Sequence, residues 1–254
     1  MELVRGGVAV HYEVAGSGPA VLLSHGFGAS LHMFRPNAPA LTTDHTLITW
    51  DQRGHGGSDS PADPEQYSTA LAVDDMVAIV DAAGVERAVV GGHSLGGYLS
   101  LAFHFAHPDR VAALVLIDTG PGYRSDDGRQ KWNRMAEKYA ADLEQRGLAA
   151  LGGSGELSAS VHRDARGLVH AARRVLTQAD ATVVDSLPAI AVPVLVVVGE
   201  RDKPFLAGSS YMADKISDAE LVVIPGAAHA PNVTHTAEFD AHVRTFLDRL
   251  EVPR

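Results

Sequence analysis

The sequence contains no cysteine, which excludes disulfide bonds, thiolate metal sites and cysteine nucleophiles together. It also lacks an excess of basic residues, because 21 Lys and Arg stand against 31 Asp and Glu, for a formal net charge of −10. Proteins that bind a phosphate backbone or anionic lipid normally carry a positive surface. We therefore expect neither a nucleic-acid partner nor a membrane partner.

Long apolar segments are missing as well. The longest apolar runs are 111–117 and 192–198, and Pro193 interrupts the second. A helix that spans a bilayer needs roughly 20 apolar residues. Residues 1–11 include no apolar stretch of the length found in signal peptides. We expect a soluble protein, most simply a cytoplasmic one.

The composition is that of a globular protein, with 46% hydrophobic and 20% charged residues in a chain of 254. This length allows one large domain, or one domain with an insertion. Short apolar runs alternate with helix-like stretches, a pattern typical of a mostly parallel sheet with helices on both faces. We predict an eight-stranded sheet: a hairpin of residues 3–4 and 8–14, followed by strands at 20–24, 46–50, 88–91, 111–117, 194–198 and 221–224.

One stretch has no strand-like run: about 70 residues between Asp118 and Val194, which we interpret as a helical insertion. Within it, apolar residues recur at helical spacing from Val161 to Leu176 and predict one packed helix face. The opposite face would carry His162, Arg163, Arg166, Arg173 and Arg174. We interpret that face as solvated rather than as an anion site.

The strongest chemical motif is Gly92-His93-Ser94-Leu95-Gly96, which directly follows a predicted strand and directly precedes an apolar helix at 99–105. A G-x-S-x-G in this context predicts a nucleophilic serine on a sharp strand-to-helix turn. The turn would also direct the N–H of Leu95, at the helix N-terminus, toward an oxyanion. We predict that Phe27, in the loop after strand 20–24, supplies the second oxyanion donor.

A serine hydroxyl needs a histidine to accept its proton and a carboxylate to orient that histidine. Asp202 and His229 each follow a predicted buried strand. Because the carboxyl ends of parallel strands share one edge of a sheet, both can converge on Ser94. Asp118 also ends a strand and is the alternative acid, although we favour Asp202.

Several of these segments together resemble the alpha/beta-hydrolase superfamily over about residues 7–250. The motifs that carry the resemblance are H-G-F-G, D-Q-R-G-H-G-G-S, G-H-S-L-G-G, H-P-D-R, G-E-R-D and G-A-A-H. The resemblance implies a core of residues 1–119 and 190–254 and a helical cap of residues 120–189, inserted after strand six. It leaves the substrate open, because one scaffold hosts many reactions.

The residues narrow the chemistry to acyl transfer. Serine rather than aspartate at position 94 argues against epoxide hydrolases and haloalkane dehalogenases. The resemblance also argues against carbon–carbon bond hydrolases, because members of the family with that activity usually have a tryptophan directly after the catalytic histidine, where this sequence has Ala230. The sequence is similar to 3-oxoadipate enol-lactonase and to small bacterial carboxylesterases, so we expect a hydrolase that acts on a small-molecule ester or lactone. A thioesterase, a perhydrolase, a carbon–carbon bond hydrolase and a slow-turnover ligand receptor of the same fold remain open, as does a monomer or homodimer.

The sequence points to no metal and no cofactor. His104 and His107 are three residues apart on a predicted helix, but two ligands do not make a metal site. In the insertion, Trp132, Met135 and Tyr139 share one helical face. That face is either a packing seam or the roof of the substrate pocket.

Overall fold

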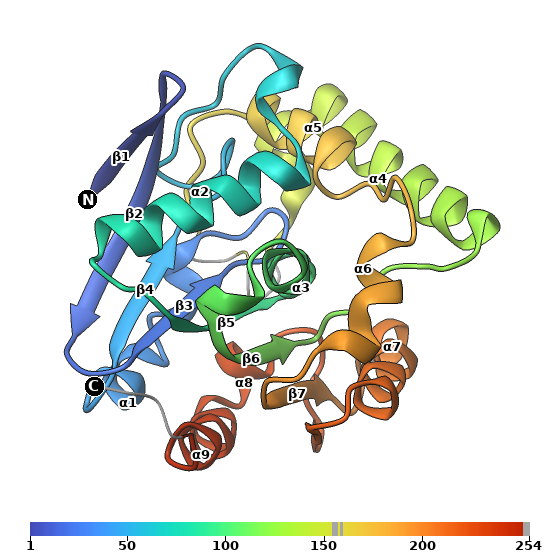
Figure 1. The fold of residues 1–254 in the computed structure, drawn as a ribbon. Helices are drawn as coiled ribbons and strands as arrows, with labels where there is room; N and C mark the ends of the chain where they lie inside the picture. The colour runs from blue at the N-terminus through green and yellow to red at the C-terminus, as the bar shows by residue number, and fades with distance from the viewer. Residues whose placement is uncertain (154–156, 158–159, 251–254) are drawn as a thin grey trace.

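The computed structural model describes residues 1–153, 157 and 160–250. Within these residues, eight strands form one sheet in the order β1-β2-β4-β3-β5-β6-β7-β8 (Figure 1). The strands are β1 (Glu2–Arg5), β2 (Val8–Gly16), β3 (Ala20–Ser24), β4 (Thr46–Trp50), β5 (Ala88–His93), β6 (Val111–Ile117), β7 (Val194–Gly199) and β8 (Ala219–Ile224). The α-helices of the same residues are α1 (Ala38–Leu41), α2 (Thr69–Ala82), α3 (Leu95–Ala106), α4 (Asp126–Arg146), α5 (Ala165–Arg174), α6 (Thr182–Ser186), α7 (Lys203–Lys215), α8 (Pro231–Thr234) and α9 (Thr236–Leu247).

The sheet is mostly parallel. The pairs β1–β2 and β2–β4 are antiparallel, and every pair from β4 to β8 is parallel. This arrangement confirms the predicted alpha/beta fold. Strand β4 pairs with one side of β3, and the next strand, β5, pairs with the other side. The strand order therefore reverses between β3 and β5. Ligands of such sheets bind outside the carboxyl ends of the strands at this reversal.

Alternate residues of the strands pack into two separate hydrophobic cores, one on each face of the sheet. On β7, Val194 and Val196 belong to a cluster with the inner faces of α2 and α3, whereas Leu195 and Val197 pack with residues of α9. Figure 1 shows the two layers, with α2 and α3 on one side of the sheet and α1 and α9 on the other. Burial on both faces explains why β7 is a continuous apolar run instead of an alternating one.

The segment between β6 and β7 contains the helices α4, α5 and α6, and no strand among its described residues. The Ser125 side chain caps α4 by accepting a hydrogen bond from the N–H of Gly128. Leu143 of α4 and Leu168 of α5 are buried in a small cluster of their own. In Figure 1 these two helices lie side by side at the upper right of the view.

The prediction that the helix face begins at Val161 is wrong. Helix α5 begins only at Ala165, because Asp164 takes the N-cap position and accepts a hydrogen bond from the N–H of Gly167. Val161 precedes the helix and is 76% exposed. The prediction is right for the later positions, where Leu168 and Val169 are buried.

Of the five basic residues predicted on a solvated face, only His162 differs, because the four arginines are exposed or half-buried. His162 is buried, and Arg163 pairs with Asp59 of the core. The other arginines also pair with carboxylates: Arg166 with Asp164, Arg173 with Glu137 and Glu144, and Arg174 with Glu65. These carboxylates neutralise the positive charge, which agrees with the expectation that the face is not an anion site.

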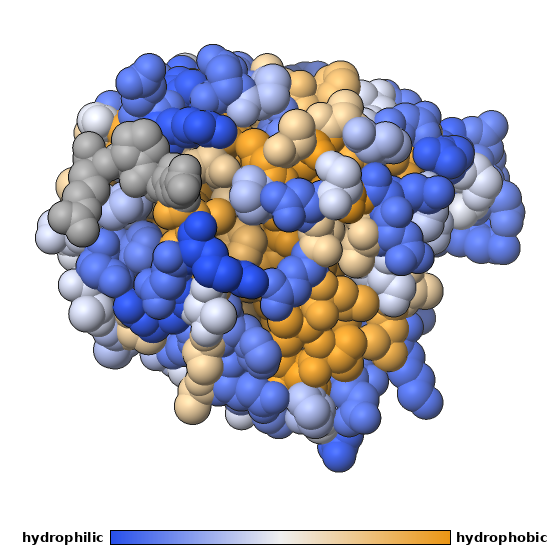
Figure 2. Space-filling model, turned by 60° about the horizontal axis from the view of Figure 1, so that its bottom comes forward, coloured by the Kyte–Doolittle hydropathy of each residue, from blue (hydrophilic) through white to orange (hydrophobic). Residues whose placement is uncertain are grey.

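Among the described residues, no helix is both long and apolar enough to cross a membrane. The face seen in Figure 2 carries one central area of hydrophobic residues, and hydrophilic residues surround it.

Candidate active site

Ser94 occupies the turn between β5 and α3 in strained backbone, with φ 52° and ψ −115°. A residue other than glycine rarely adopts a positive φ. The turn also demands small neighbours: a Cβ at Gly92 would lie 2.5 Å from the carbonyl oxygen of Ser24 and from the carbonyl carbon of Gly96. Strain of this kind persists where the surrounding structure enforces it, and it is concentrated at functional sites.

A carboxylate and an imidazole lie at the same edge of the sheet. Asp202 follows β7 and precedes α7, and His229 lies in the loop after β8. The Oδ2 atom of Asp202 is 2.7 Å from Nδ1 of His229. The Asp202 side chain is 4% exposed and that of His229 is 32% exposed, so the carboxylate is enclosed while the imidazole faces the site.

Asp118, the alternative acid, lies close by but has another role in the structure. Its Oδ1 atom accepts a hydrogen bond from the N–H of Gly199 at 2.9 Å. Within the described part of the chain, Asp118, Asp202 and His229 form a group whose possible ligand atoms lie within 4.8 Å of one another. Because Nδ1 of His229 is bonded to Asp202, the geometry favours an acid–base pair of Asp202 and His229 here.

The two residues predicted as oxyanion donors lie in the loop after β3 and in the first turn of α3. Leu95 is the first residue of α3, so its N–H has no acceptor within the helix. Phe27 lies between Gly26 and Gly28, and its side chain lines a cavity together with Ser94 and His229. A helix N-terminus beside a serine can stabilise a developing negative charge.

His162 supports the Phe27 loop from the inserted segment. Its Nε2 lies 2.8 Å from the carbonyl oxygen of Gly28, and its Nδ1 accepts a hydrogen bond from the N–H of Gly56 at 3.0 Å. Since Nδ1 is an acceptor, Nε2 carries the hydrogen and donates a hydrogen bond to the carbonyl oxygen of Gly28. Burial lowers the pKa of His162 below its ordinary value, which favours this neutral form. The sequence analysis missed this contact.

His93, the second residue of the G-x-S-x-G motif, contacts the loop of the candidate base. Its Nε2 donates a hydrogen bond to the carbonyl oxygen of His229, and the two imidazole rings are 4.6 Å apart. Burial holds the pKa of His93 well below its ordinary value, so the ring is neutral. The ring of Phe205 also stacks on His229, with the ring centroids 4.8 Å apart. The position of His93 within the motif was the only sequence signal for this contact.

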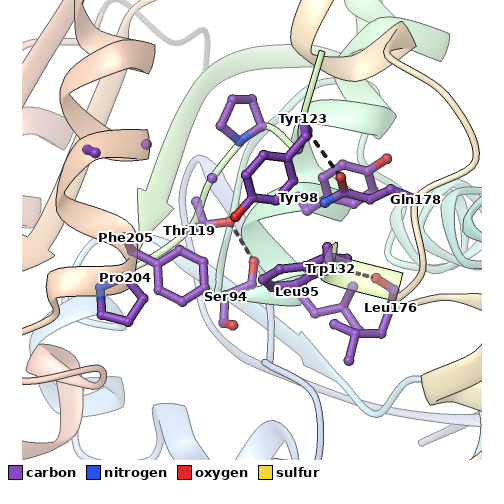
Figure 3. A pocket seen from close by; sticks show the side chains of 15 residues that line it. Ser94, Leu95, Tyr98, Thr119, Tyr123, Trp132, Leu176, Gln178, Pro204 and Phe205 are labelled. Carbon is purple, nitrogen blue, oxygen red and sulfur yellow. Dashed lines mark hydrogen bonds between the residues drawn. The ribbon is translucent and has the colours of Figure 1, made fainter. Parts of the chain in front are cut away.

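Two cavities meet at Ser94 and share Trp132, Leu176 and Phe205 in their walls. The first has a volume of about 230 Å³ and extends past Leu95 toward Gln178 (Figure 3). The second has a volume of about 470 Å³, and its wall includes Phe27, His229 and all three residues of the predicted helical face: Trp132, Met135 and Tyr139. The indole N–H of Trp132 donates to the carbonyl oxygen of Leu176 at 2.7 Å, which fixes this shared wall.

The described residues that line the two cavities include neither lysine nor arginine. The charged side chains among them are Asp142 and Asp202, both acidic. Most of the other side chains in the walls are aliphatic or aromatic. Such a cavity is suited to a neutral, largely apolar ligand.

The model of the alpha/beta hydrolase fold family matches residues 19–155, more than half of the chain. A protein of Variovorax paradoxus (strain S110), described as a carbamate hydrolase, is 31% identical over 96% of this chain and 98% of its own length. The chain also resembles two solved structures. An enol-lactonase from Burkholderia xenovorans LB400 has a TM-score of 0.79 at 25% identity and covers 98% of this chain and 100% of its own.

The other structure is a thermophilic esterase from Thermogutta terrifontis, with a TM-score of 0.81 at 27% identity over 99% of this chain and 97% of its own. The family and the names of these relatives support hydrolase activity, and a small-molecule substrate fits the family. The chain therefore belongs to the alpha/beta hydrolase fold family.

Proposed function

We propose that this protein is a serine hydrolase that cleaves a small or medium-sized carboxylic ester or lactone. The observation that carries the proposal is the 2.7 Å contact between Asp202 and His229, at a cavity that Ser94 also lines. In this assignment Ser94 is the nucleophile, His229 the general base and acid, and Asp202 the carboxylate that orients His229. The N–H groups of Phe27 and Leu95 bind the oxyanion.

In the first step of the proposed reaction, Oγ of Ser94 attacks the ester carbonyl carbon, and its proton passes to Nε2 of His229, which lines the same cavity. The carbonyl π electrons move onto oxygen, where the N–H groups of Phe27 and Leu95 stabilise the charge. When the tetrahedral intermediate collapses, the carbon–oxygen bond to the alcohol breaks. His229 returns its proton to the leaving oxygen, and an acyl group remains on Ser94.

In the second step, water hydrolyses the acyl-enzyme through the same proton transfers in reverse. His229 takes a proton from the water as it attacks the acyl carbon, and the bond to Oγ of Ser94 breaks as the serine regains a proton. The products are one carboxylic acid and one alcohol, and the enzyme returns to its starting state. For a lactone, both product groups belong to the same molecule.

The substrate of this reaction is neutral around the scissile bond. A carboxylate on the substrate would be desolvated among apolar walls and acidic side chains, without a cation among the described lining residues. We therefore expect neutral esters and lactones to react faster than half-esters of dicarboxylic acids.

Residues 120–189 form a cap in this proposal, and residues 1–119 with 190–254 form the catalytic core. Trp132 and Tyr139 of α4 line the cavity from the inserted segment, while Ser94 and His229 line it from the core. A cap in this position excludes bulk solvent from the site, while leaving room for the hydrolytic water, and strengthens the electrostatic interactions there.

The test is the hydrolysis of p-nitrophenyl butyrate by the purified protein and by its Ser94→Ala variant, at equal concentration. We expect many turnovers for the first and no turnover above the buffer rate for the second. Undiminished hydrolysis by the variant would refute the assignment. A single slow turnover by the unmodified protein would instead indicate a receptor that keeps its acyl group.

A further inference from the structure

The cavity of about 230 Å³ contains a polar group that the proposed reaction does not use, the side-chain amide of Gln178. Gln178 is 8% exposed and lies in the segment between α5 and α6. In Figure 3 it lies across the cavity from Ser94, and its side chain extends toward the middle of the lining residues. A buried amide among apolar walls needs hydrogen-bond partners.

Contacts within the protein fix the orientation of this amide. Its Oε1 atom accepts a hydrogen bond from the N–H of Tyr123 at 3.1 Å, which identifies the other terminal atom as the nitrogen. The side chain of Asn133 holds the main chain of Gln178: its Oδ1 accepts a hydrogen bond from the N–H of Gln178 at 2.8 Å, and its Nδ2 donates one to the carbonyl oxygen of Gln178 at 2.9 Å. Gly122 packs against the amide, since a Cβ there would lie 3.1 Å from Oε1.

The amide nitrogen is left as a donor toward the ligand. Among the described residues, the hydrogen bonds of Gln178 involve its Oε1 and its main chain, and none involves Nε2. Tyr98 lines the same cavity, and burial raises the pKa of its hydroxyl to about 12, so it stays protonated. This part of the cavity therefore presents neutral donors and no positive charge.

The two cavities receive different parts of the ester. His229 must protonate the leaving alcohol, and it lines the cavity of about 470 Å³ but not the one of about 230 Å³. The alcohol therefore departs through the larger cavity. The acyl group occupies the smaller one, beside Leu95 and in front of Gln178.

We infer that the acyl group of the substrate carries a second, neutral acceptor oxygen, a ketone or an ether, that binds the Nε2 amide hydrogens of Gln178. This inference rests on the proposed function, because it concerns the acyl side of the same site. An unbranched alkyl chain would cover the donor without satisfying it, and an unsatisfied buried donor is unfavourable. An acyl chain with the oxygen at the right position should therefore gain about tenfold in kcat/KM.

The experiment compares p-nitrophenyl hexanoate with its 4-oxo and 5-oxo analogues, so that the ketone moves along an otherwise identical chain. The readout is the ratio of kcat/KM for each oxo ester to that for hexanoate. We expect one of the two ratios to reach about ten in the unmodified protein. In Gln178→Leu and Gln178→Glu that ratio should fall to about one. The glutamate keeps an acceptor for the N–H of Tyr123 but loses the donor.

Gln145→Leu is the matched control, because Gln145 is exposed on α4 and should leave the ratio at its original value. A ratio near one in the unmodified protein, with hydrolysis that still depends on Ser94, would overturn this inference and leave the proposed function intact. An elevated ratio that survives Gln178→Glu would overturn it too. Hydrolysis that does not depend on Ser94 would overturn both.

Discussion

Replacing His162 with alanine should weaken both the fold and the proposed catalysis, because this side chain joins the inserted segment to two loops of the core. The imidazole is 8% exposed. It accepts a hydrogen bond from the N–H of Gly56 and donates one to the carbonyl oxygen of Gly28. Both of these glycines are buried, so alanine would leave one donor and one acceptor without their partner.

The magnitude follows from these two groups. A buried polar group that loses its partner costs about 1–3 kcal/mol, so the two groups together predict that His162→Ala lowers the free energy of unfolding by about 2–6 kcal/mol. Gly28 directly follows Phe27, the proposed oxyanion donor. Losing such a donor outright costs about a hundredfold to a thousandfold in kcat, and displacing it costs less. We expect kcat for a p-nitrophenyl ester to fall about tenfold, with a smaller change in KM.

Urea denaturation and steady-state kinetics measure the two effects on one preparation. Arg163→Gln is the control, because it removes the neighbouring ion pair between Arg163 and Asp59. The side chains of these two residues are 49% and 35% exposed, and such a surface ion pair contributes about 0–1 kcal/mol. His162→Gln should recover part of both losses, because an amide can also donate and accept. If His162→Ala matched Arg163→Gln in stability and in kcat, the supporting role of His162 would be refuted.

Three further outcomes are expected. Asp202→Asn should lower kcat about ten-thousandfold because it disturbs the orientation of His229, and a larger loss in Asp118→Asn would reverse the assignment of the acid. Burial lowers the pKa of His25 from 6.5 to about 4, so the unfolded chain binds a proton there before the folded one does. The contribution of His25 to stability should therefore be complete above pH 6.5 and fall by about 3 kcal/mol on acidification to pH 4, and urea midpoints that stay constant over this range would contradict it. Gly167→Ala should cost about 1–3 kcal/mol, because its Cβ would lie 2.5 Å from the Cα of a core glycine, whereas Gly153→Ala, with nothing within 4 Å, should leave the melting temperature nearly unchanged.

The fold and the meeting of Asp202 with His229 could be predicted because each depends on a local pattern and one general rule. Asp202 and His229 each follow a buried strand, and parallel strands end at a common edge. The elbow around Ser94 carries its own signal, since the glycines beside it are required by close backbone approach. These inferences did not require knowing how elements that are remote in sequence pack against one another.

The inserted segment could not be predicted to the same depth. The apolar spacing continued back to Val161, but the competing cap by Asp164 decided where α5 begins. Asp164 followed by Gly167 was a local signal for that boundary. The burial of His162, in contrast, follows from contacts with Gly28 and Gly56, which are more than 100 residues away in the chain.

Helix α5 connects the two functions that the geometry suggests for the inserted segment. His162 lies just before its first turn and holds the Phe27 loop, while Gln178 lies shortly after its last turn and faces the acyl cavity. Ten helical residues span about 15 Å, and the packing of Leu168 against Leu143 of α4 makes the two helices one body. A movement of this pair of helices would change the Phe27 loop and the cavity of about 230 Å³ together. In the proposed function, selectivity for the acyl group and the rate of the chemical step would therefore be coupled, since both would depend on how α5 packs on the core.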